Sequence, residues 1–108
     1  MAFSLADLEA VIAQRAESTA AASYTKSLLE AGTARCAKKF GEEAIEPVIA
    51  AVQQDRDAFV AETADTLYHL LVLLQSRGLT LQNALDELER RTAQSGHQEK
   101  AARGQPVG

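Results

Sequence analysis

Five carboxylates in this chain recur at a spacing that brings side chains together on one face of a helix. Glu42, Glu43 and Glu46 fall within little more than one helical turn. Glu62 and Asp65 repeat the i,i+3 spacing farther along the chain. Like charges at this spacing repel one another, so a cation is expected to compensate for them. An oxygen-only group of this kind favours hard cations such as Mg²⁺ and Mn²⁺.

Two neighbouring helices would bring the acidic pairs together. The stretch between Glu46 and Glu62 is long enough for the end of one helix, a turn and the start of the next. An antiparallel hairpin would then place Glu-x-x-Glu opposite Glu-x-x-Asp. The plain alternative is a solvated acidic face, which explains most runs of Glu on helices. Asp65 argues against it, because it stands one turn before an apolar run, where an unpaired charge is costly.

The elements that must carry these side chains are helical. Ala, Leu, Glu and Gln dominate the 108 residues, and Gly and Pro number only 6 and 2, so long uninterrupted helices are favoured. Aromatic residues are 5% of the chain, so the core must be built from Leu, Val, Ile and Ala. We expect an all-α fold, a helical bundle of about four to five helices assembled as a dimer. Residues 1–92 would form a single catalytic domain, and residues 93–108 a mobile C-terminal tail.

Capping signals set the expected helix ends. The predicted helices are residues 5–19, 24–31, 33–54, 57–77 and 81–91. Ser4 and Asp7 have the spacing of a capping box at the first helix. Thr33 is expected to cap the third helix. Gly32 and Gly78 are expected to end the second and the fourth.

Two features predict departures from a simple monomeric bundle. Pro47 falls inside the third helix, where it leaves the Glu43 carbonyl without its amide partner and costs roughly 3 kcal/mol. A kink or local bulge is therefore expected beside the acidic run. The apolar run Leu70–Leu74 places side chains all around the fourth helix. One copy of so small a chain can hardly cover them, which predicts a homodimer.

Charge and composition exclude several functional classes. A formal net charge of −4 argues against non-specific nucleic-acid binding. The single Cys36 excludes an intramolecular disulfide framework and is interpreted as a small hydrophobe. No apolar run reaches the ~18–20 residues that span a bilayer, and the N-terminus lacks the basic start of a signal peptide. We expect a cytoplasmic protein without nucleic-acid or membrane partners.

Three segments in order resemble the phosphoribosyl-ATP pyrophosphohydrolase family, within the all-α nucleoside triphosphate pyrophosphatase superfamily (MazG-type). They are SYTKSLLEAG, KKFGEEAIE and ETADTLYHLLVLLQSRGL, and the resemblance covers roughly residues 23–91. It implies that the chain hydrolyses phosphoribosyl-ATP to phosphoribosyl-AMP and pyrophosphate with Mg²⁺, the second step of histidine biosynthesis.

The same resemblance implies roles for the carboxylates. The superfamily mark, E-x-x-E followed by E-x-x-D, falls on four residues that would hold the metal: Glu43, Glu46, Glu62 and Asp65. Glu42 would assist as an outer ligand or a base, so Glu42 and Glu43 are the expected catalytic residues. Pro47 departs from the ordinary helix residue expected after Glu46.

A triphosphate is strongly anionic, so cations are expected beside the acidic run. Mg²⁺ would neutralise part of the charge and polarise a phosphoryl oxygen. Lys39, next to the acidic run, is the favoured phosphate contact. Tyr24 would stack on a base or bind a phosphate through its hydroxyl, unless it packs in the core. The remaining candidates for substrate binding are Lys38, Lys26, Lys100 and Arg103.

Other functions share parts of this pattern. A housecleaning pyrophosphatase acting on non-canonical nucleoside triphosphates would use the same metal site with a different base and sugar pocket. A helical dimer that only buffers metal is the non-enzymatic alternative, although Lys38 and Lys39 beside the site would not suit a cation store. A di-iron bundle expects Glu-x-x-His, whereas the i+3 partner of Glu62 is Asp65.

Overall fold

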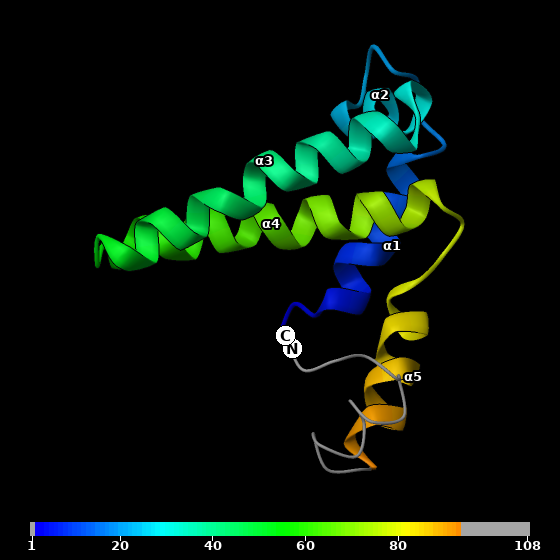
Figure 1. Cartoon of the computed structure of the whole chain (residues 1–108). Helices are drawn as coiled ribbons and strands as arrows, with labels where there is room; N and C mark the ends of the chain where they lie inside the picture. The colour runs from blue at the N-terminus through cyan, green and yellow to red at the C-terminus, as the bar shows by residue number, and fades with distance from the viewer. Residues whose placement is uncertain (1, 94–108) are drawn as a thin grey trace.

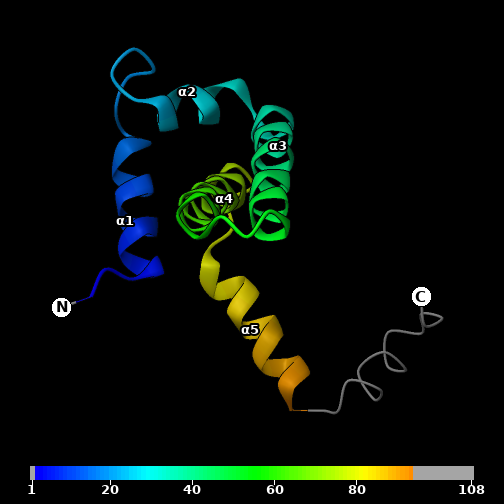
Figure 2. The same ribbon diagram turned by 90° about the vertical axis from the view of Figure 1, so that its left-hand side faces the viewer.

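Five α-helices make up the part of the chain that the computed structural model describes, residues 2–93. They are α1 Leu5–Arg15, α2 Tyr24–Ala31, α3 Thr33–Val52, α4 Arg56–Ser76 and α5 Leu81–Thr92. The helices α3 and α4 form a long hairpin, with α1 and α2 near one end of it and α5 leading away (Figure 1). Figure 2 shows α1 and α3 on opposite sides of α4, with α2 bridging their ends. Residues 2–93 contain no strand, so the all-α prediction is confirmed.

The first helix begins as predicted and ends early. The Ser4 hydroxyl accepts a hydrogen bond from the Asp7 amide at 3.1 Å, and the Asp7 carboxylate accepts one from the Ser4 amide at 2.9 Å. The helix ends at Arg15 and not at the predicted Thr19. Thr19 instead accepts a bond from the Ala22 amide at 3.2 Å. Side-chain bonding of this kind offers the backbone an alternative to helix and explains the early end.

The turn between α3 and α4 is fixed from both sides. Gln54 takes a φ of 60°, so the Asp55 amide reaches the Ala50 carbonyl at 3.2 Å in the Schellman arrangement. Asp55 then caps α4, because its side chain accepts from the Ala58 amide at 3.0 Å. The turn therefore holds the two helices antiparallel, which is what brings their acidic residues together.

Glycine ends α2 and follows α4, as predicted. Gly32 and Gly78 have φ values of 99° and 69°. Gly32, with ψ 171°, lies in a backbone region that is essentially restricted to glycine. Thr33 is not the cap of α3, because Gly32 occupies that position and Thr33 is the first helical residue. The Thr33 hydroxyl donates instead to the Ser76 carbonyl at 3.3 Å, which ties α3 to the end of α4.

The helix α3 is α-helical on both sides of Pro47, so the local bulge is absent, and the kink stays a prediction. The Glu43 carbonyl still loses the amide that an ordinary residue at position 47 would offer. A side chain of α4 replaces that amide, as the site geometry below shows.

The core lies where α1, α2, α3 and α4 meet. Its buried residues are Ile12, Leu28, Cys36, Leu71 and Val72. Cys36 is 1% exposed and donates to the Leu28 carbonyl, and its burial raises the pKa of the thiol. Leu73 and Leu74 pack against this core and Leu70 is half-buried, so the chain itself covers much of the run. The apolar run is therefore not evidence for a dimer, contrary to the prediction.

The last helix is anchored at its start. The Glu9 carboxylate on α1 accepts a bond from the Leu81 amide at 2.6 Å. Thr80 and Asn83 add a capping box. No residue of α5 is buried. None of the helices within residues 2–93 combines the length and apolar character needed to cross a membrane.

We expect Gly32→Ala to lower the free energy of unfolding by about 1–3 kcal/mol, because L-residues rarely adopt this backbone conformation. No heavy atom of residues 2–93 lies within 4 Å of the Cβ it would add, so the effect would come from backbone strain. Gly41→Ala is the matched control, with equally open space inside α3. It should raise stability by about 0.5–1 kcal/mol. Urea unfolding measures both, and a neutral Gly32→Ala would contradict the strain.

Candidate active site

Three carboxylates from the two hairpin helices converge. One oxygen each from Glu43 of α3 and from Glu62 and Asp65 of α4 lie within 4.8 Å of one another. Glu43 and Glu62 are half-buried, and Asp65 is exposed. Glu46, which was predicted to join them, is exposed and lies outside this close group. The structure thus brings three of the four predicted ligands together and leaves the fourth at the edge.

Burial and charge repulsion act together on Glu62. Desolvation raises the pKa of this carboxyl, and the charges of Asp65, Glu46 and Glu43 raise it further. Glu46 is therefore close enough for its charge to be felt at the centre of the group. The donors are carboxylate oxygens, and neither a thiolate nor an imidazole belongs to the group within residues 2–93. This donor set fits a hard divalent cation.

Lys39 offsets part of the negative charge. Its Nζ lies 3.4 Å from Oε1 of Glu43 and 4.0 Å from Oε1 of Glu42. The Lys39 side chain is 26% exposed, so it stands at the edge of the group, where an anion could be met. Glu42, an expected catalytic residue, is exposed and outside the close group. Lys38 is exposed on the same helix.

The hydroxyl of Thr66 joins α3 to α4 beside the carboxylates. Its Oγ1 lies 3.0 Å from the carbonyl oxygen of Glu43 and 2.8 Å from that of Glu62. Pro47 has no amide hydrogen to offer the Glu43 carbonyl, and Thr66 supplies a donor in its place. This bond explains how α3 remains helical through Pro47. Sequence reasoning missed Thr66. The available signal was Pro47, which leaves the Glu43 carbonyl without a donor, so a hydroxyl on the facing helix could be expected to supply one.

His69 packs against two tyrosines and feels the charge of the carboxylates. Its side chain is largely buried, with 6% of the residue exposed, and burial lowers the pKa of the imidazole. The opposing influence of Glu43 is smaller. The imidazole packs edge-on against Tyr68, with ring centres 5.0 Å apart, and against Tyr24 at 6.1 Å. The buried ring therefore contacts both aromatic side chains and lies close enough to the acidic group for the charges of Glu43 and Asp65 to act on it.

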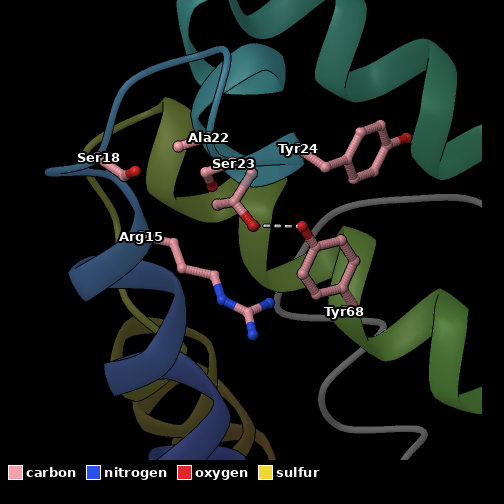
Figure 3. A pocket seen from close by; sticks show the side chains of 7 residues that line it. Arg15, Ser18, Ala22, Ser23, Tyr24 and Tyr68 are labelled. Carbon is pink, nitrogen blue, oxygen red and sulfur yellow. Dashed lines mark hydrogen bonds between the residues drawn. The ribbon is translucent and has the colours of Figure 1, made fainter.

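A cavity of about 430 Å³ lies beside the two tyrosines (Figure 3). It is lined by Arg15, Ser18, Ala22, Ser23, Tyr24, Thr25 and Tyr68. Thr25 is 1% exposed, and its hydroxyl is hydrogen-bonded to that of Tyr68. Tyr24, a predicted substrate residue, is 53% exposed and so does not pack in the core. Sequence reasoning missed Arg15 and Tyr68, because only the packing of α1 against α4 brings them together.

The other predicted substrate residues lie elsewhere. Lys26 is half-buried, and its backbone amide donates to the Ser23 hydroxyl at 3.2 Å. Lys100 and Arg103 lie outside the described residues, as does the predicted tail from residue 94 onward.

Comparisons with known proteins agree on one family. The family model described as phosphoribosyl-ATP pyrophosphohydrolase matches residues 5–92. A protein of Azorhizobium caulinodans named phosphoribosyl-ATP pyrophosphatase is 57% identical over 99 residues, which cover 92% of this chain and 91% of that protein. A protein of the same name from Agrobacterium fabrum is 54% identical over 105 residues, 97% of this chain and 98% of its own length.

We expect Thr66→Val to destabilise the fold by about 1 kcal/mol or more, because the Glu43 carbonyl would lose its donor. Thr66→Ser should retain most of the stability. In a Pro47→Ala background the restored amide can bond to the same carbonyl, so Thr66→Val should cost less there. A double-mutant cycle from urea unfolding measures this coupling, expected at roughly 0.5–3 kcal/mol. Strict additivity of the two changes would contradict the compensation.

Proposed function

The chain belongs to the phosphoribosyl-ATP pyrophosphohydrolase family, and on that premise we propose that it hydrolyses phosphoribosyl-ATP to phosphoribosyl-AMP and pyrophosphate. This reaction is the second step of histidine biosynthesis, and we place it in the cytoplasm, with residues 1–92 as the single catalytic domain. The observation that carries the proposal is the convergence of Glu43, Glu62 and Asp65 within a chain of this family.

We assign Mg²⁺ to the carboxylate group, with Glu43, Glu62 and Asp65 as its ligands and Glu46 as the fourth. The three convergent oxygens support Glu43, Glu62 and Asp65 as ligands. The charge of Glu46, which raises the pKa of Glu62, supports Glu46 as the fourth. When bound, Mg²⁺ supplies charge neutralisation and polarises a phosphoryl oxygen.

The chain's own side chains account for the remaining steps. Glu42 is exposed and outside the close group, so its carboxylate is available to take the proton of the attacking water, a role that Glu43 would share. Lys39 already lies beside Glu43, and its ammonium group can contact the phosphates as they arrive. Lys38 is a second cation for the same anionic chain.

We expect Glu62→Gln and Asp65→Asn each to lower Mg²⁺-dependent pyrophosphate release from phosphoribosyl-ATP by at least ~10–100-fold. Each change keeps the shape of the side chain and replaces an anionic ligand by a neutral one. Because the carboxylates repel one another without metal, both variants should be at least as stable as the wild type in EDTA. Excess Mg²⁺ should raise the melting temperature of the wild type and raise that of the variants less.

Glu30→Gln is the matched control for these two variants, because Glu30 is exposed on α2 and outside the carboxylate group. It should behave as the wild type does in both assays. Near-normal, Mg²⁺-dependent turnover by Glu62→Gln would overturn the assignment. Faster release from non-canonical nucleoside triphosphates than from phosphoribosyl-ATP would instead indicate the housecleaning activity.

We also propose that the chain acts as a homodimer. The half of the α3–α4 hairpin near its turn extends beyond the other helices (Figure 1). Exposed apolar side chains gather there: Ile45, Val48, Ile49, Val52, Phe59 and Val60. Exposed apolar surface of this extent is typical of an interface. A second copy of the same hairpin would supply a matching apolar surface through a two-fold axis.

Val52 is 78% exposed, and we expect Val52→Asp to weaken the dimer, because the change would place an unpaired charge in the interface. Sedimentation velocity across a concentration series would show the shift, and circular dichroism would check that the helices persist. Phe3→Asp is the matched control, since Phe3 is exposed at the other end of the chain. A folded wild-type monomer at micromolar concentration would contradict the dimer.

A further inference from the structure

We propose that the cavity beside Tyr68 is an anion subsite and that Arg15 holds there the phosphate of the substrate's added ribosyl group. The inference rests on the proposed function, since phosphoribosyl-ATP carries an anionic group at each end. The carboxylate group with its metal takes the triphosphate. The second phosphate needs a cation elsewhere.

The charge of the cavity lining is unlike that of the chain. The chain has 15 acidic residues against 11 Lys and Arg. Among residues 2–93, none that lines the cavity is acidic, and Arg15 is the one charged residue of that lining. An anion is therefore favoured here, whereas a metal cation would find no carboxylate.

Arg15 is available to such a ligand. It makes no ion pair with a carboxylate of residues 2–93. Its guanidinium extends from α1 toward Tyr68 of α4 (Figure 3). The planar guanidinium offers several N–H donors in a geometry that matches a phosphate. A cation in the last turn of α1 also suits the helix dipole, but that role would not require a cavity beside it.

The hydroxyls around Arg15 can add donors. Thr25 and Tyr68 share one hydrogen bond, which uses one of their two hydroxyl protons and leaves the other to donate to a ligand. The Ser23 oxygen accepts from the Lys26 amide, so its proton is also available. Ser18 lines the same cavity. A lining of donors around one guanidinium suits a phosphate, which offers only acceptors when fully ionised.

The subsite and the carboxylate group share one helix. Tyr68 follows Asp65 by three residues, which is about 4.5 Å along the axis of α4. The two regions are therefore neighbours along α4, and the substrate carries its two anionic groups at opposite ends. Because nucleoside triphosphates without the added ribosyl phosphate cannot fill the cavity, Arg15 would set the preference for phosphoribosyl-ATP.

The test separates binding from turnover. For Arg15→Gln we expect KM for phosphoribosyl-ATP to rise roughly 10–100-fold, as the loss of a charge-assisted contact implies, with kcat little changed. Release from ATP should not change. Ribose 5-phosphate, titrated by calorimetry in EDTA, should bind the wild type and not Arg15→Gln, and Arg15→Lys should recover part of the binding. Arg77→Gln is the matched control, because Arg77 is exposed at the end of α4 and outside the lining.

The outcomes distinguish this inference from the proposed function. If Arg15→Gln only lowers the melting temperature and leaves KM and ribose 5-phosphate binding unchanged, Arg15 is a helix-dipole partner and the subsite is overturned. Absence of ribose 5-phosphate binding to the wild type at millimolar concentration would overturn it as well. If the wild type binds ribose 5-phosphate through Arg15 but does not hydrolyse phosphoribosyl-ATP, the proposed reaction fails while the anion subsite stands.

Discussion

Repulsion among carboxylates held on two facing helices is the constraint on which the rest of this structure depends. Glu43, Glu62 and Asp65 would separate if the hairpin were loose, because each gains hydration and loses repulsion by moving apart. The turn at Gln54 and Asp55 fixes one end of the hairpin. The bond from Thr33 to Ser76 and the core around Leu71 and Val72 fix the other. The fold thus holds the carboxylates together against their repulsion. A cation bound between the helices relieves this repulsion and so stabilises the folded state.

Thr66 compensates for the amide that Pro47 lacks, and it does so at the backbone of the candidate ligands. A proline beside the ligands removes a bond that would otherwise keep α3 regular. The replacement comes from α4, and the two carbonyls near the Thr66 hydroxyl belong to Glu43 and Glu62, one candidate ligand on each helix. The hydrogen bond to the Glu43 carbonyl therefore also ties the backbone of α3 to α4 beside the two candidate ligands. A bond within α3 alone would repair the helix without that consequence.

Local sequence signals predicted the helices and the acidic group. They did not predict the contacts between segments that are distant in the sequence. The capping box of Ser4 and Asp7 acts within a few residues, so the start of the first helix follows from the sequence. The i,i+3 spacing predicted which carboxylates share a helix face but not which edge of that face meets α4. Glu43 is half-buried and Glu46 exposed, so the contact runs closer to Glu43. The cover over Leu71 and the cavity beside Arg15 depend on how α1 and α2 pack, which periodicity alone does not fix.

Two neighbouring regions of α4 face surroundings of opposite charge. Its first half carries Glu62 and Asp65, where excess negative charge attracts a cation. Tyr68, one turn on, faces a cavity whose charge is positive. His69, beside Tyr68, is buried with a lowered pKa, so it adds little charge to either region near neutral pH. Arg15 makes no ion pair with a carboxylate of residues 2–93, so each region remains able to bind a ligand of the opposite sign.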